Sequence, residues 1–233
     1  MKIGERVSAY FAGRLAQRTL LLGILPAVFV SYFGALILAI LLSPGPHDWY
    51  SATISKLAFH PKNHAKYDNG WMASDGIALT GMLIAPFAGY IGCRFHSAAR
   101  EAARFGAGCF RAGAFGCLLS GMIAYRADSA FPGLHTLLAR FCALALSLAM
   151  FSFWFCALKA RFRRPAEVHG HARLLFVCWT LLIMVGPAAA LLSAIDSGRH
   201  QTPTGLYEWL ASALAYLFLL AAAALLPDTP SQG

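Results

Sequence analysis

The chain has 233 residues, of which 58% are hydrophobic and only 12% are charged, and its mean hydropathy is +0.59. A water-soluble domain of this length needs a more polar surface, so the composition excludes an ordinary soluble globular protein. Long apolar runs separated by short charged segments predict a polytopic helical membrane protein, because a helix satisfies its backbone hydrogen bonds within its own segment. The meaning of the net charge of +9 then depends on where the basic residues lie.

Six apolar runs are long enough to cross a bilayer. The first, 19–42, has 24 uncharged residues. It would extend about 36 Å as a helix, and it is too long for the apolar core of a signal peptide. The other runs are 73–93, with Asp75 at its start and Pro86 as an expected kink, 105–125, 133–158, 174–195, and a last run from Tyr207 to Pro227. We therefore predict an all-α, six-helix transmembrane bundle forming one domain over 19–226.

The third run also contains Arg111 and an unusual number of glycines. Small residues at such spacings let helices approach closely, so the simplest interpretation is packing between helices. The glycines are Gly106, Gly108, Gly113, Gly116 and Gly121.

The distribution of Lys and Arg predicts the topology. Twelve lie in segments on one side of the predicted membrane: Lys2, Arg6, Arg14, Arg18, Arg94, Arg100, Arg104, Lys159, Arg161, Arg163, Arg164 and Arg173. Five lie on the other side: Lys56, Lys62, Lys66, Arg126 and Arg199. The positive-inside rule then places both termini in the cytoplasm, with a basic segment at 1–18, a tail at 227–233 and an outer connection at 43–72. Nucleic acid is not an expected partner, because topology explains the basic excess.

Motifs for common chemistries are missing from the sequence. The six cysteines fall within or at the edge of apolar runs without CxxC or CxxH spacing, and we interpret them as packing residues. His60 and His64 could present two imidazoles to zinc, but spacing supplies no third ligand, so no metal and no cofactor are predicted. The Gly-x-Ser-x-Gly elbow, the HExxH pattern and the P-loop are absent.

Polar residues concentrate at the predicted outer face. Six of the ten acidic residues lie there: Asp48, Asp68, Asp75, Asp128, Asp196 and Glu208. Ionisable groups within spans are costly and normally face the bundle interior or a wet cavity, which draws attention to Asp75, His135, Arg140 and Glu208. Each also has a simpler interpretation. The carboxylates could compensate a helix dipole, His135 could pack between helices, and Arg140 could snorkel.

These groups could support acyl transfer. Ser51 or Ser55 would supply a hydroxyl nucleophile, His135 the general base, and Asp75 or Glu208 the group that orients it. Arg140 and Arg126 would meet lipid phosphate. Trp71 and Trp209 fit the aromatic belt at the membrane surface, where they would contact the lipid.

Several stretches in order resemble one group of six-span membrane proteins. They are Thr53-Ile-Ser-Lys-Leu57 before the second span, Gly116-Cys-Leu-Leu-Ser-Gly-Met-Ile-Ala124, His135, and Glu208-Trp209. The group includes damage-regulated autophagy modulators, Sfk-type yeast proteins and GPI-anchor lipid-remodelling proteins, together with a related bacterial family of uncharacterised six-span proteins. The resemblance covers nearly the whole chain. Lys56 stands where the group has a loop acid, so no role of that acid transfers.

The resemblance implies a six-helix protein concerned with lipids, with Ile54, Ser55, His135, Glu208 and Trp209 as landmarks of an outer-leaflet pocket. Our leading hypothesis is therefore lipid handling or remodelling through an outer-facing polar pocket that receives a phospholipid or lipid-anchor head group. Acyl transfer or lipid hydrolysis there stays open. The alternative is a non-catalytic accessory subunit or lipid organiser that docks to a partner membrane protein or to another copy of itself. A Gly- and Ala-rich basic chain without glycosylation sequons on its outer loops favours a bacterial inner membrane.

The topology has a direct test. Residue-specific labelling in intact cells is expected to find Lys62 and His135 on the same, non-cytosolic surface. Labelling of these two residues from opposite surfaces would contradict the predicted pocket.

Overall fold

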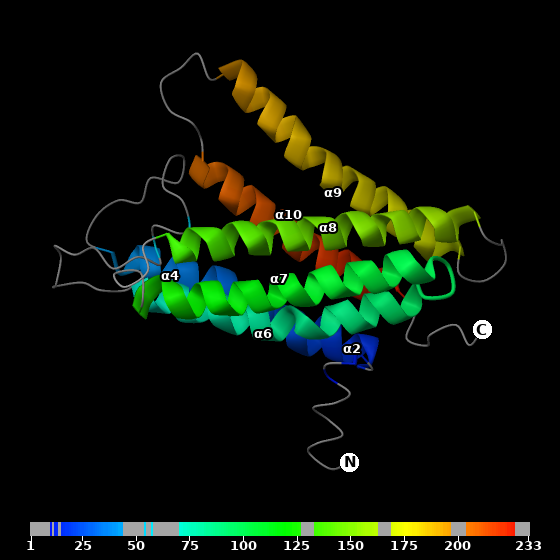
Figure 1. Ribbon diagram of the computed structural model, residues 1–233, viewed down its shortest axis with the longest axis horizontal. Helices are drawn as coiled ribbons and strands as arrows, with labels where there is room; N and C mark the ends of the chain where they lie inside the picture. The colour runs from blue at the N-terminus through cyan, green and yellow to red at the C-terminus, as the bar shows by residue number, and fades with distance from the viewer. Residues whose placement is uncertain are drawn as a thin grey trace, which may run out of the picture.

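Figure 1 shows the computed structural model, in which long helices lie along a common direction. The structure describes residues 10, 12–13, 15–43, 54, 57, 70–126, 133–162, 169–196 and 204–226, without the side chains of 124–126, 169–171, 186–196 and 204. All of the regular structure in these residues is helical. We call the end that holds the 43–69 connection the outer end, and the opposite end the inner end.

The first span is one helix, Gln17–Leu41, interrupted by two wider π-helical turns. Pro26 has no N–H to donate and its ring crowds the carbonyl group of Leu22, so a wider turn directly before it relieves the conflict. The sequence predicted this span but not the wider turns. Its segments are α2 (Gln17–Thr19), η1 (Leu20–Ile24), α3 (Leu25–Phe29), η2 (Val30–Gly34) and α4 (Ala35–Leu41).

Five long helices follow: α6 (Gly70–Arg94), α7 (Arg100–Arg126), α8 (Leu134–Phe162), α9 (His169–Asp196) and α10 (Thr204–Leu225). Among the described residues, five helices are long and apolar enough to cross a membrane: Gln17–Leu41, Gly70–Arg94, Arg100–Ile123, Leu134–Phe162 and Gly205–Leu225. The described part of α9 contributes a shorter apolar stretch, Ala172–Val185. The prediction of a multi-pass helical membrane protein is therefore confirmed. The sixth span and the cytoplasmic position of the termini stay predictions.

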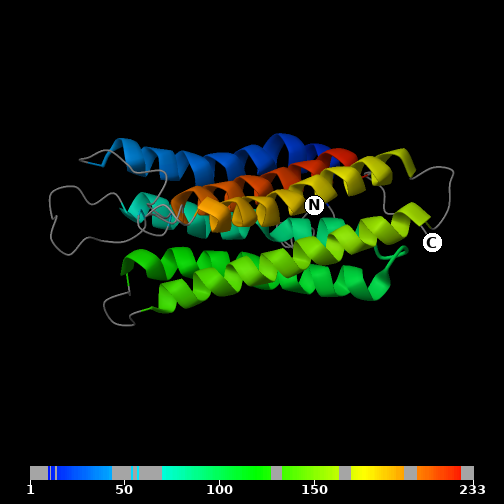
Figure 2. The same ribbon diagram turned by 90° about the horizontal axis from the view of Figure 1, so that it is seen from above.

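The helices pack mainly in antiparallel pairs. α7 lies between α6 and α8 and packs closely against both. The view in Figure 2 places α7 and α8 on one side of the molecule, the first span on the opposite side, and α6 between them. α9 and α10 meet towards the inner end and diverge towards the outer end, as Figure 1 shows.

Glycines bring the backbones of α6 and α7 into direct contact. A Cβ atom on Gly81 would lie 2.5 Å from the Leu118 backbone nitrogen. One on Gly121 would lie 2.4 Å from the backbone nitrogen of Ala78. The Ser74 hydroxyl donates a 2.7 Å hydrogen bond to the Gly121 carbonyl oxygen across the same interface. Only glycine allows this separation, and small residues are the usual means of close packing between helices in membranes.

Other glycines of α7 face α8. A Cβ on Gly113 would lie 2.7 Å from Cγ of Leu146, and one on Gly106 would lie 3.0 Å from the Phe153 ring. Gly108 is different, because a Cβ there would have nothing within 4 Å. Four of the five glycines identified in the sequence thus pack against other helices of this chain. A Gly113→Leu substitution would therefore disturb the packing of α7 on α8, and it could not be used to test whether α7 docks against a partner protein.

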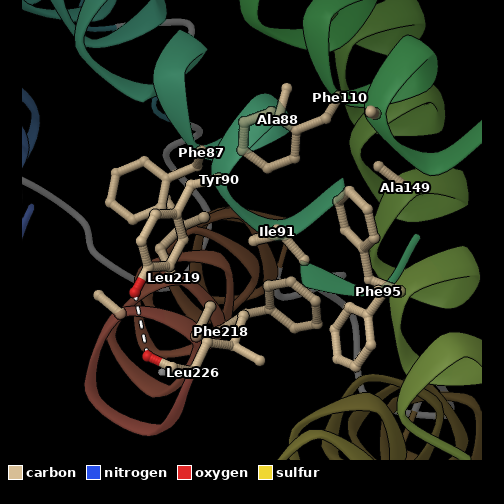
Figure 3. Close-up of a cluster of buried hydrophobic side chains, with 14 of the residues drawn as sticks. Phe87, Ala88, Tyr90, Ile91, Phe95, Phe110, Ala149, Phe218, Leu219 and Leu226 are labelled. Carbon is tan, nitrogen blue, oxygen red and sulfur yellow. Dashed lines mark hydrogen bonds between the residues drawn. The ribbon is translucent and has the colours of Figure 1, made fainter. Parts of the chain in front are cut away.

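The main apolar core joins α6, α7, α8, α9 and α10 with the first span. Figure 3 shows Phe87 and Tyr90 beside Phe218, and the Tyr90 hydroxyl donates a 3.1 Å hydrogen bond to the Leu226 carbonyl oxygen. The Trp179 ring stacks on Phe218 with centroids 4.1 Å apart, and its Nε1 donates to the Phe218 carbonyl oxygen at 3.2 Å. These contacts attach α9 to α10 in the half nearer the inner end.

The Tyr10 hydroxyl replaces a helical hydrogen bond that Pro86 cannot form in α6. Pro86 lies inside α6 and cannot donate to the carbonyl oxygen of Met82, four residues earlier. The Tyr10 hydroxyl donates to that oxygen at 3.0 Å. Partial burial raises the pKa of Tyr10 above its usual value, so the phenol stays protonated and remains a donor. The N-terminal segment is therefore attached to α6 as well as to the first span.

The α6–α7 contact can be tested with one small substitution. Gly121→Ala places a methyl group against the α6 backbone, and we expect a loss of about 1–3 kcal/mol in the free energy of unfolding, as overpacking generally costs. Gly108→Ala on the same helix is the control and should leave stability unchanged or slightly raised. Equal unfolding midpoints in detergent for both variants would contradict the contact.

Candidate functional site at the outer end

A second apolar cluster lies at the outer end and forms the floor of the candidate site. Ile54, from the outer connection, is 5% exposed and packs there with the first span, α6 and α7. Trp209 of α10 packs against the same cluster, so landmarks predicted from distant parts of the chain come together. The buried members are Leu36, Ala39, Ile54, Ala73, Ile77 and Cys117, with Tyr32, Leu57, Met72, Cys142 and Trp209 packed around them.

The Glu208 carboxylate connects the outer connection to α10. Its Oε2 accepts a hydrogen bond from the Ile54 backbone N–H at 2.6 Å. Hydrogen bonds with an ionised acceptor are shorter and stronger than those between neutral groups. Glu208 is the fifth residue of α10 and lies beyond its first turn, so the helix dipole adds little to this bond. Glu208 therefore holds Ile54 in place while its side chain stays partly exposed at the end of the bundle.

A hydroxyl pair continues from Glu208 into the bundle. The Ser212 hydroxyl donates to the Glu208 carbonyl oxygen at 2.8 Å, and the Tyr32 hydroxyl lies 2.8 Å from Ser212 Oγ. Since Ser212 has one proton and uses it on the carbonyl, Tyr32 is the donor to Ser212. The Phe33 ring lies 6.4 Å from the ring of Trp209, in a stacked arrangement. The carboxylate thus sits at the rim of an aromatic and apolar surface.

His135 is placed differently from Glu208. It is 2% exposed, at the start of α8, and its Nδ1 lies 3.1 Å from both the hydroxyl oxygen and the carbonyl oxygen of Ser120 on α7. Ser120 is 4% exposed. The hydrogen bonds described for His135 and for Glu208 share no residue.

The other predicted residues that the structure describes are more exposed than His135. Asp75 is exposed in the second turn of α6. Arg140 is exposed on α8 between Leu137 and Leu144, which are 65% and 61% exposed. Arg140 lies five residues after His135, which turns it about 140° around the helix axis. It therefore faces the apolar outer surface of α8 rather than the interior face that buries His135.

Some predicted groups lie outside the described residues, namely Ser51, Ser55, His60, His64 and the side chain of Arg126. Trp71 begins α6 and is 44% exposed. Conversely, sequence reasoning missed three hydroxyl groups: Ser120, which contacts His135, and Tyr32 and Ser212, which lie beside Glu208. The available signal was a polar side chain within an apolar span, but such residues are common and their partners cannot be read from spacing.

The described part of this end offers groups suited to binding. Glu208 supplies a fixed negative charge beside aromatic rings, which suits an amine or hydroxyl donor. Ser120 and His135 form a hydroxyl–imidazole pair, but both are almost wholly buried. Within the described part of the chain, no group of three His, Cys, Asp or Glu side chains is arranged to hold a metal ion.

Comparison with known proteins identifies a family without an assigned activity. A family model described as "Protein of unknown function (DUF998)" matches residues 26–225. The match includes the whole outer connection and all of the long helices, apart from the first turns of the first span. Neither the curated proteins nor the solved structures give a match. The likeness to autophagy modulators and lipid-remodelling proteins therefore stays a prediction. The protein is a membrane protein that belongs to the DUF998 family.

Proposed function

We propose that the protein binds a phospholipid of the outer leaflet at the outer end of the bundle, with the lipid head group beside Glu208. The observation that carries the proposal is the position of this carboxylate, held by the Ile54 N–H at 2.6 Å and bordered by an aromatic and apolar cluster. Ionisable groups at membrane depth are costly, and they commonly mark the path or site of a ligand.

The surroundings of Glu208 favour a lipid over a small soluble ligand. Trp209 and Tyr32 present rings with polar edges, a combination suited to the level of the head groups. The described contacts of the carboxylate occupy Oε2. A head-group ammonium would add a charge-assisted hydrogen bond to the same carboxylate.

The divergence of α9 from α10 supports access from the bilayer. The two helices meet through Trp179 and Phe218 in the inner half and separate towards the outer end (Figure 1). Leu181 and Met184 on α9 and Leu206 on α10 are exposed apolar side chains that could lie against acyl chains. With the predicted topology, the outer end of the bundle faces the outer leaflet of a bacterial inner membrane and both termini lie in the cytoplasm.

The resemblance identified in the sequence adds independent support. Ile54, Glu208 and Trp209 are landmarks of that likeness, and they lie together in the second cluster. The group they resemble is concerned with lipids. We therefore propose lipid handling as the role of this chain, with binding rather than chemistry as its basis.

The test removes the charge of the Glu208 side chain and preserves its shape. Glu208→Gln retains an amide oxygen that accepts from Ile54 but removes the negative charge. We expect phosphatidylethanolamine to bind about tenfold more weakly, as removal of a hydrogen bond to a charged group typically costs. Native mass spectrometry of the full chain, titrated with this lipid in detergent, measures the change.

Glu101→Gln is the matched control, because Glu101 lies near the inner end on α7 and its side chain is 84% exposed. This variant should bind phosphatidylethanolamine like the parent protein. Equal affinities for the Glu208 variant and the control would refute the site. Phosphatidylcholine has a positive charge but no N–H to donate, so the Glu208 substitution should weaken its binding less than that of phosphatidylethanolamine.

Acyl transfer is the second candidate, and the Ser120–His135 contact is the observation that favours it. The Ser120 hydroxyl lies 3.1 Å from Nδ1 of His135, the separation expected of a nucleophile and its base. Burial argues against it, since exposures of 4% and 2% leave no path for an ester to the hydroxyl unless α7 and α8 separate. We therefore place this candidate behind lipid binding.

A turnover assay distinguishes the two candidates. We expect the purified chain in liposomes to release no fatty acid from labelled phospholipid above a protein-free sample. Release that disappears in both Ser120→Ala and His135→Ala would replace the binding proposal with acyl transfer. Ser152→Ala, which removes a hydroxyl bonded to the Ala102 carbonyl oxygen on α7, is the control and should not affect such release.

A further inference from the structure

A groove of about 600 Å³ lies between α6 and α7 at the inner end, far from Glu208. Its floor consists of small, buried residues: Gly89 and Gly92 from α6, and Ala103 and Ala107 from α7. A Cβ on Gly92 would lie 3.1 Å from Cβ of Ala107, so the two helices are close and the missing side chains leave the space above them open.

Helical spacing aligns polar residues along the same groove. Cys93 follows Gly92 at the end of α6, and His96 lies in the turn just after that helix. Arg104 and Arg111 flank Ala107 by three and four positions on α7. Residues three, four and seven positions apart share a helix face, so the groove combines a Gly and Ala floor with basic walls.

Arg111 lies unusually deep for an exposed charge. It is 11 residues beyond Arg100, the first residue of α7, which corresponds to about 16 Å along the helix. No ion pair with another described residue is found for it. Arg104, two turns nearer the inner end, is 3.7 Å from the Glu101 carboxylate and is partly neutralised. Arg111 is therefore the cation that most needs an anionic partner.

We propose that this groove binds the head group of an anionic phospholipid of the inner leaflet, with its phosphate paired to Arg111. A guanidinium group matches phosphate oxygens with two parallel hydrogen bonds, and basic pockets between spans on the cytoplasmic side suit anionic head groups. The head group fills the groove along Arg104 and His96, and the small residues of the floor give it room.

The surface beyond Arg111 favours a lipid over a free phosphate ion. Phe115, one helical turn deeper on α7, is 59% exposed and lies on nearly the same helix face as Arg111. Acyl chains that continue from a phosphate at Arg111 would lie against this ring. Inorganic phosphate would gain nothing from this apolar surface. This site is separate from the outer one, at the opposite end of the bundle and with the opposite charge preference.

Cys93 provides a direct footprint, because it is an exposed thiol in the groove. Bound phosphatidylglycerol should slow alkylation of Cys93 by N-ethylmaleimide, about tenfold when the lipid is at ten times its Kd. Cys109 on α7 does not line the groove and serves as the internal control, with both sites followed by mass spectrometry of peptides from the full chain in detergent. Phosphatidylcholine and inorganic phosphate should give no protection.

Arg111→Gln should raise the phosphatidylglycerol concentration needed for half-protection by about tenfold. Arg100→Gln removes the same charge from the same helix outside the groove and should leave that concentration unchanged. Equal effects of the two variants would overturn the proposal. So would equal protection by phosphatidylcholine. Protection by inorganic phosphate alone would assign the groove to a free anion and overturn the lipid assignment.

Discussion

Direct contact between the backbones of α6 and α7 is the constraint on which the rest of the bundle depends. Lipid tails are as apolar as leucine side chains, so burial alone gives helices in a bilayer little reason to associate. Close packing and polar bonds between helices must supply the stability instead. Gly81 and Gly121 provide the first, and the Ser74 bond to Gly121 provides the second. Fixing α7 on α6 also fixes Ser120 beside His135 on α8, and it sets the separation that leaves the groove at the inner end.

The outer end is organised by a different interaction. Ile54 comes from the connection between the first two spans, whereas Glu208 begins the last helix, and a single 2.6 Å hydrogen bond joins them. Apolar packing of Ile54 against α6 and α7 accompanies this bond, so the loop is attached by polar and apolar contacts together. The Tyr32–Ser212 pair extends the contact to the first span. Glu208 thus helps to connect three parts of the chain, through its carboxylate to Ile54 and through its backbone carbonyl group to the Ser212–Tyr32 pair.

The sequence predicted the helices well because each span must satisfy its own backbone and bury itself in lipid, which leaves a long local signal. Five spans were placed within a few residues of their observed ends. The site was only partly predictable. Glu208 and Ile54 were identified, but their contact depends on how the first and last spans pack, which local patterns do not encode. His135 was assigned to the same pocket as Glu208, whereas its described bonds go to Ser120 because its face of α8 packs on α7. The wider turns of the first span were missed as well.

The basic residues at the inner end have two roles that must be separated. Arg94, Arg100 and Arg104 contribute to the charge bias that predicts the topology, so their presence at that end would be expected without any lipid site. Arg111 does not contribute to the bias, since it lies within a span, and topology gives no reason for a guanidinium group at that depth. Its position beside a Gly- and Ala-lined groove therefore needs an explanation of its own. An anionic head group supplies one, and the orientation predicted by the positive-inside rule would bring that groove to the leaflet in which anionic lipids attract basic segments.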